Sequence, residues 1–181
     1  YRMVVIPGFE ISHNSPLNHR SAHILALGVE NFIDPNQDFP ALCEQIRAQG
    51  GLAVAAHPVS TRKWEKQTFA LWNRREELRE CFDAWEVASG PYLFDEVLSS
   101  GLPMIASSDL HAPKQMTSWK TVLECERSAP AILEAIRRQE LTFTFYRDVR
   151  ETAALPLHAF RSLQSFSPLR AAASRAVVSL A

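Results

Sequence analysis

Residues 102–111 read LPMIASSDLH, an apolar run and two serines that are followed by Asp109, a leucine and His111. The apolar run predicts a short buried strand, so the carboxylate and the imidazole should lie where this strand ends. Both groups are suitable ligands for zinc, manganese or iron, and at the C-terminal end of a parallel strand both can reach one polar cluster. The stretch therefore indicates a candidate metal site at the end of a buried strand.

Candidate ligands recur beside other apolar runs. The run GGLAVAA ends in His57, the run MVVIPGF continues into Glu10, and His23 opens the run HILALG. A lone histidine is more often an ordinary core or surface residue than a metal ligand. Recurrence at the same topological position favours a shared metal site. Its predicted ligands are Glu10, His23, His57, Asp109 and His111.

Four motifs resemble, in order and in spacing, the later motifs of the PHP family (polymerase and histidinol phosphatase). They are IPGFEIS, HILALG, GGLAVAAHP and LPMIASSDLHAP, and the resemblance extends from about residue 2 to about residue 148. It implies an α/β fold, a distorted (β/α)7 barrel with two or three metal ions at the C-terminal ends of its strands. It also implies a metal-dependent phosphoesterase.

The H-x-H motif with which members of this family open is not found in the sequence. The resemblance therefore implies an incomplete, N-terminally truncated barrel, and for such a chain we expect low stability or self-association and little activity. It further implies that Glu10, His23 and His57 bind one ion, with Glu10 bridging to a second. Asp109 would belong to the second ion and His111 to a third. We expect this chain to hold one divalent ion, which is Mn, Zn or Fe.

Apolar strands alternate with helical patterns along the chain, which is typical of an α/β fold. Residues 1–148 form the predicted metallohydrolase domain, and residues 149–181 a tail that is weakly ordered or forms a short helix. Helices are expected at 39–49, 67–81, 92–100 and 129–140, and strands between them at 83–88, 103–106, 121–124 and 141–145.

The composition excludes several functional classes. Hydrophobic residues make up 46% of the 181 residues, and no stretch approaches the 18 or more apolar residues of a membrane span. The net charge of -1 gives no field for stable nucleic-acid binding or for an anionic membrane surface. Three widely spaced cysteines favour reduced thiols and a cytoplasmic protein. The sequence does not predict the oligomeric state.

The predicted reaction is hydrolysis of a phosphomonoester or phosphodiester by metal-activated water, with a small phosphorylated substrate as the partner. Arg62 and Lys63 follow the His57 motif and could hold the substrate phosphate, although a solvated helix entrance gives the same pattern. We expect His13 to be a loop residue without a ligand role. Glu86 is expected to be an inward carboxylate that accepts hydrogen bonds.

Two alternative functions remain open at this point. The first is a non-catalytic PHP-like remnant that serves as a structural or binding module, which the missing H-x-H motif favours. The second is a metal-dependent amidohydrolase or deaminase, because similar ligands serve those reactions on related barrels.

Overall fold

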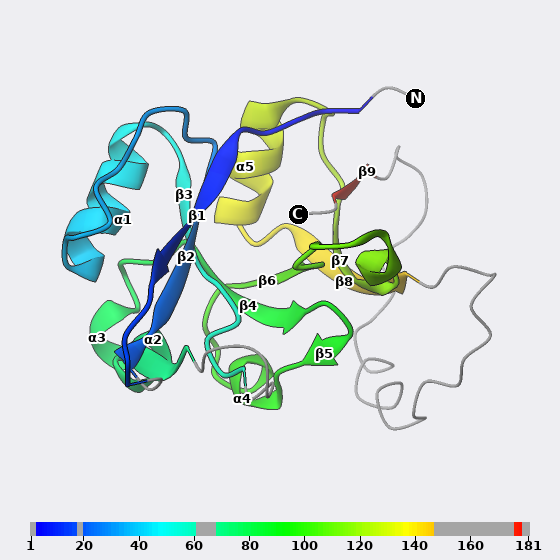
Figure 1. Ribbon diagram of the computed structural model, residues 1–181. Coiled ribbons are helices and arrows are strands. Elements are labelled where there is room, and N and C mark those ends of the chain that lie inside the picture. The colour runs from blue at the N-terminus through cyan, green and yellow to red at the C-terminus, as the bar shows by residue number, and fades with distance from the viewer. Residues whose placement is uncertain (1–2, 18–19, 61–67, 147–175, 179–181) are drawn as a thin grey trace.

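A computed structural model describes residues 3–17, 20–60, 68–146 and 176–178 of the chain. Its strands form one six-stranded sheet and one three-stranded sheet, and helices pack against them (Figure 1). The fold is therefore mixed α/β, and the described residues form no closed barrel.

The six-stranded sheet carries the candidate ligands. β1, β2, β3 and β4 are neighbours in this order, and β4 also pairs with β6 and, over two residues, with β5. β1, β2 and β3 pair antiparallel, whereas β3, β4 and β6 run parallel. The strands are β1 (Gly8–His13), β2 (Ala22–Leu27), β3 (Leu52–Ala55), β4 (Ala84–Ser89), β5 (Tyr92–Leu93) and β6 (Met104–Ser107).

The three-stranded sheet is antiparallel, with β7 (Ser118–Leu123) between β8 (Leu141–Tyr146) and β9 (Ala176–Val178). The Thr121 hydroxyl connects it to the larger sheet. This hydroxyl accepts from the Ala106 N–H at 2.9 Å and donates to the Ala106 carbonyl at 2.8 Å, so β7 lies beside β6.

The helices begin and end where the sequence provides caps. α1 (Phe39–Ala48) begins where the Asp38 carboxylate accepts the N–H of Ala41. It is followed by Gly50, whose φ of 78° is accessible to glycine without strain. α5 (Ala129–Arg137) begins at Ser128, whose hydroxyl accepts from the N–H of Ala131. The shorter helices are α2 (Phe69–Asn73), α3 (Arg75–Leu78), α4 (Asp95–Leu98) and a 3-10 helix (Pro113–Met116).

Two apolar clusters lie on opposite faces of the larger sheet. Alternate residues of each strand point to opposite faces, so neighbouring core residues of β3 belong to different clusters. One cluster includes Trp85 of β4 and the α1 residues Leu42 and Ile46. The other includes Ile105 of β6 and Ile136 of α5. Figure 1 accordingly shows α1 and α5 on either side of the strands.

The sequence prediction is correct in outline and wrong in several details. Strands form at or near all the predicted positions, and the helices at 39–49 and 129–140 are confirmed with slightly earlier ends. The single helix predicted at 67–81 is wrong, because the described part consists of the short α2 and α3. The helix predicted at 92–100 is also shorter than expected, because Tyr92–Leu93 pair with β4 as β5.

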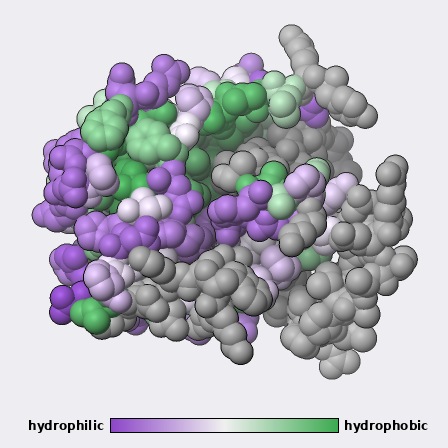
Figure 2. Space-filling model, viewed as in Figure 1, coloured by the Kyte–Doolittle hydropathy of each residue, from purple (hydrophilic) through white to green (hydrophobic). Residues whose placement is uncertain are grey.

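The surface of the described residues is partly hydrophilic and partly apolar. Figure 2 shows hydrophilic residues over much of the viewed face, with an apolar patch in its upper part. Three exposed large apolar side chains are Met3, Val5 and Phe32.

β9 lies within residues 149–181, which were predicted to form a tail. Most of that segment lies outside the described residues.

The three cysteines are free thiols, as expected. Among the described residues, no helix is both long enough and apolar enough to cross a membrane.

Candidate metal centre

Glu10 and His23 meet across the first strand pair of the sheet. Glu10 lies in the middle of β1 opposite Leu25, and His23 lies two residues before Leu25 on β2. Residues separated by two along a strand point to the same face, so the two side chains are diagonal neighbours. The Glu10 Oε1 atom lies 2.6 Å from His23 Nδ1.

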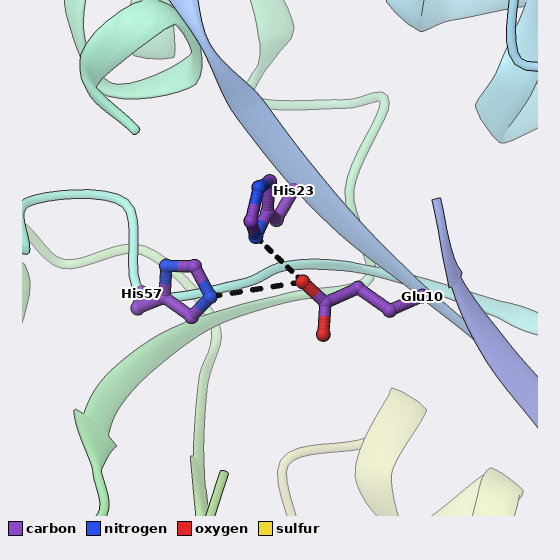
Figure 3. Close-up of side chains that lie close together, drawn as sticks. All are labelled: Glu10, His23 and His57. Carbon is purple, nitrogen blue, oxygen red and sulfur yellow. Dashed lines mark ion pairs between the residues drawn. The ribbon is translucent and has the colours of Figure 1, made fainter. Parts of the chain in front are cut away.

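His57 reaches the same carboxylate from the third strand. The Ala56 N–H donates to the His23 carbonyl at 3.0 Å, which extends the pairing of β2 with β3 and places His57 immediately beyond it. His57 Nε2 lies 3.8 Å from Glu10 Oε1, and the two imidazole centroids are 4.9 Å apart. Figure 3 shows both histidine rings beside one carboxylate oxygen of Glu10. The candidate ligand atoms of the three residues all lie within 4.8 Å of one another.

The backbone at His57 is in an unusual conformation that its neighbours stabilise. Its φ is 29°, in the left-handed region that is unfavourable for residues with a β-carbon. The Glu86 carboxylate accepts the His57 N–H at 2.6 Å, and the Thr68 hydroxyl donates to the His57 carbonyl at 2.6 Å. Thr68 Oγ1 also lies 3.2 Å from His57 Nδ1. Both the main chain and the ring of His57 are thus held by buried neighbours.

Glu86 lies inside β4 and connects this strand to His57, which follows β3, and to Ser107 at the end of β6. Its side chain is buried on β4, and its second oxygen accepts a short hydrogen bond from the Ser107 hydroxyl at the end of β6. Burial holds the pKa of Glu86 above its ordinary value, although His57 and the Ser107 hydroxyl act in the opposite direction. The predicted hydrogen-bonding role of Glu86 is therefore confirmed. The signal in the sequence is one charged residue in an otherwise apolar strand.

Asp109 and His111 lie in the loop that follows β6. Asp109 has a φ of 49°, and the His111 Nδ1 atom lies 3.4 Å from its Oδ1. Gln115 fixes the loop with both ends of its amide, because Oε1 accepts the His111 N–H at 2.8 Å and Nε2 donates to the Asp109 carbonyl at 3.1 Å. The Asp109 side chain is only 10% exposed, whereas that of His111 is 75% exposed. Nothing in the sequence identifies Gln115 or Thr68 in advance.

One pocket of about 150 Å³ joins these groups. Three carboxylates and two histidines contribute to its walls, together with apolar residues, and none of the described residues that line it is a lysine or an arginine. The lining residues are Glu10, Leu25, Ala56, His57, Glu86, Ser107, Asp109, Leu110 and His111.

The donor set fits a divalent cation. Both ring nitrogens of His23 are buried, and apart from Nδ1, which lies 2.6 Å from Glu10 Oε1, they have no polar partner among the described residues. Nδ1 pairs with the Glu10 carboxylate, and the ring nitrogen of His23 that does not carry the proton has a lone pair inside the buried cluster. One carboxylate with two imidazoles is a donor combination that zinc and similar ions accept. Glu10, His23 and His57 would hold such an ion.

Electrostatics couples the three residues. Contact with His23 and His57 holds the pKa of Glu10 far below its ordinary value, against the opposing effect of burial. Burial alone would lower the pKa of His57, but Glu10, Glu86 and Asp109 outweigh burial and raise it above 6.5. A carboxylate that stays ionised at neutral pH is the form that binds a metal.

The structure brings Glu10, His23 and His57 into one cluster, whereas Asp109 and His111 lie outside this cluster and line a pocket with Glu10 and His57. The expectation that all five lie at strand ends is wrong. His57 and the Asp109–His111 loop do follow β3 and β6, whereas Glu10 lies inside β1 and His23 near the start of β2. The difference arises because β2 runs antiparallel to both β1 and β3. The start of β2 therefore lies beside the end of β3 and close to the middle of β1.

The predictions for His13, Arg62 and Lys63 concern residues other than the five predicted metal ligands. His13, at the end of β1, packs edge-on against Phe39 with ring centroids 6.0 Å apart, and it is not in the cluster. Arg62 and Lys63, the predicted phosphate-binding residues, lie outside the described residues.

No family model and no curated protein sequence matches the chain. Among solved structures, the chain is similar to a two-domain protein from Bacteroides vulgatus ATCC 8482 that contains a predicted PHP-like metal-dependent phosphoesterase. The TM-score is 0.60 and the identity 24%, over 79% of this chain and 45% of that one. The chain thus spans less than half the length of that protein. At this identity the likeness shows the fold, a mixed α/β arrangement compatible with the PHP-like neighbour.

Proposed function

We propose that this chain belongs to a metal-dependent phosphoesterase, which hydrolyses a phosphomonoester or phosphodiester. The observation that carries the proposal is the convergence of Glu10, His23 and His57 from three adjacent strands, within 4.8 Å of one another. The similarity to a structure with a PHP-like phosphoesterase supports the same reading.

The pocket favours an anionic substrate only together with a cation. Its described walls carry the carboxylates of Glu10, Glu86 and Asp109 and no lysine or arginine, so a phosphate group alone would be repelled. A divalent ion held by Glu10, His23 and His57 would neutralise the phosphate oxygens and lower the pKa of water at the site to about 7. The acidic walls are therefore a reason to expect cation-dependent recognition.

The volume of the pocket limits how much of a substrate can enter it. Pockets for whole drug-sized ligands have volumes of roughly 300–1,000 Å³. The volume of about 150 Å³ suits a reacting group the size of phosphate, while the remainder of the substrate stays outside. Asp109, which is mostly buried in the wall, presents a carboxylate oxygen that can accept a proton from water near the reacting group. His111 also lines the pocket, and its side chain is much more exposed than that of Asp109.

Elemental analysis combined with an aryl phosphate assay tests the proposal. The purified chain should contain near-stoichiometric Mn, Zn or Fe and should release phosphate when Mn²⁺ is added, at the low rate that we expect of this chain alone. His57→Ala should lose both properties, whereas His13→Ala, which alters a histidine outside the cluster, should keep them. A wild-type chain that binds no divalent ion and hydrolyses no phosphate ester would refute the proposed function.

A further inference from the structure

Thr68 makes two contacts with His57, and together they determine where the imidazole carries its proton. The Thr68 Oγ1 atom lies 2.6 Å from the His57 carbonyl oxygen and 3.2 Å from its Nδ1 atom. Thr68 itself is fully buried and His57 is 5% exposed, so solvent offers little alternative partner to either group.

A threonine hydroxyl has one hydrogen to donate and two lone pairs that accept. A carbonyl oxygen can only accept, so the single hydrogen of Thr68 is used in the contact with the His57 carbonyl. Toward Nδ1 the hydroxyl can therefore act only as an acceptor, and it requires a hydrogen on Nδ1. The neutral ring then has its lone pair on Nε2, the nitrogen that lies 3.8 Å from Glu10 Oε1.

From this geometry we infer that Thr68 is a positioning residue, which fixes His57 as the Nδ1–H tautomer and directs its Nε2 lone pair into the Glu10–His23–His57 cluster. The cation-binding part of this inference rests on the proposed function, and the tautomer does not.

The arrangement differs at the other histidine of the cluster. His23 has no positioning partner of this kind, because Glu10 is the only described residue whose polar atoms pair with its ring nitrogens. The protein thus selects the tautomer of His57 before a ligand binds, whereas the proton position of His23 is left to the ligand and to Glu10. Groups that orient a metal-binding histidine through its other nitrogen typically change metal affinity by 10–100-fold when they are removed.

The Glu86 carboxylate completes the restraint on His57. It accepts the His57 N–H at 2.6 Å, so the donor and acceptor of the main chain are both bonded while φ is held at 29°. With this main chain fixed, the ring can leave Thr68 only by rotation about its own side-chain bonds. Thr68 is therefore placed to act on a side chain whose main chain is already fixed.

Nitrogen NMR of the metal-free chain tests the tautomer directly. Histidine-labelled protein is recorded at rising pH until the ring signals stop changing, so that the ring is neutral, and the His57 signals are identified by their loss in His57→Asn. Wild-type His57 should carry its proton on Nδ1. Thr68→Val has nearly the same shape without the hydroxyl, so it should move the population toward Nε2–H, and Thr68→Ser should keep Nδ1–H.

Thr121→Val is a matched control. Thr121 is also fully buried, and its hydroxyl also donates to a main-chain carbonyl, that of Ala106, but it is bonded to β6 and to no histidine. This variant loses a comparable hydrogen bond and should leave the His57 tautomer unchanged. A wild-type ring that carries its proton on Nε2, or a Thr68→Val ring with an unchanged population, would overturn the inference. If Thr68→Val does not fold, the wild-type and Thr68→Ser spectra still decide it.

Zinc titration of the same variants tests the consequence for binding. Thr68→Val should bind Zn²⁺ about 10–100-fold more weakly than wild type, and Thr68→Ser should recover most of the affinity. Equal affinity of Thr68→Val and wild type would overturn the positioning role. A wild-type chain that binds no Zn²⁺ while His57 carries its proton on Nδ1 would refute the proposed function and support the tautomer assignment.

Discussion

Replacement of Glu86 should separate its hydrogen-bonding role from its charge. Glu86→Ala leaves two buried donors without their acceptor, the His57 N–H and the Ser107 hydroxyl. Each unsatisfied buried group costs about 1–3 kcal/mol. Removal also returns part of the cost of burying the carboxylate, so we expect a net loss of about 2–4 kcal/mol in the free energy of unfolding. Since small domains have about 5–15 kcal/mol in total, such a loss is large.

Glu86→Gln is the matched control because it keeps the size of the side chain. The amide oxygen can accept the His57 N–H, and the amide nitrogen can donate to Ser107, whose hydroxyl rotates to accept. We expect its stability at pH 7 to be within about 1 kcal/mol of wild type. Urea unfolding followed by tryptophan fluorescence measures all three proteins, and an unchanged m-value would indicate that the folded state keeps its compactness.

The pH dependence gives a second measurement on the same pair. Burial raises the pKa of Glu86 in the folded chain above its ordinary value of 4.5, so the folded state keeps this proton to higher pH than the unfolded state. The stability contributed by Glu86 is therefore fully present below 4.5 and is lost as pH rises through the raised pKa. Glu86→Gln lacks this loss and should gain on wild type as pH increases. The reasoning is refuted if Glu86→Ala is as stable as wild type, or if Glu86→Gln loses as much as Glu86→Ala.

Three further predictions concern the cluster and its loop. His57→Ala should reduce bound metal more than tenfold, measured by elemental analysis, and His13→Ala should not; equal losses would show that the ligands are misassigned. In chelator-treated protein, thermal stability should fall as pH rises above 6.5 through the raised pKa of His57, because the folded state then loses a proton that Glu10 stabilises. Glu10→Gln should make this fall of stability with pH less steep. An equally steep fall in Glu10→Gln would show that Glu10 does not stabilise the His57 proton. Gln115→Ala should cost about 1 kcal/mol in urea unfolding and accelerate hydrogen exchange at the His111 amide, whereas unaltered exchange would show that the Gln115 amide does not hold the loop.

Local patterns in the sequence predicted the elements of the fold better than their directions. The α5 helix follows from its cap at Ser128 and its apolar spacing, and the structure adds an ion pair in which the Arg138 guanidinium donates to the Glu134 carboxylate at 2.7 Å. The antiparallel pairing of β1 with β2 does not follow from either strand alone, because strand direction depends on which neighbour each strand meets. The family resemblance implied an incomplete (β/α)7 barrel, whereas the described strands form a mixed sheet and no closed barrel.

In the candidate site, too, some residues can be recognised from the local sequence, whereas others acquire their role only through contacts that the fold makes. Histidines and acids beside apolar runs stand out, and Glu10, His23 and His57 do meet. Thr68 is an unremarkable residue in the sequence, and only the fold places its hydroxyl against a histidine eleven positions away. Residues that orient ligands through main-chain atoms carry no compositional signal, since any neighbour with a hydroxyl or an amide can do so.

The cluster couples protonation, stability and binding through the same atoms. In the absence of a cation, the proton that the raised pKa keeps on His57 offsets the carboxylate of Glu10, which stays ionised. A divalent ion requires the deprotonated imidazole, so proton and cation compete for the Nε2 position of His57. Rising pH therefore removes the positive charge that stabilises the metal-free fold and, over the same range, strengthens cation binding. A bound cation would replace the proton as the positive partner of the Glu10 carboxylate.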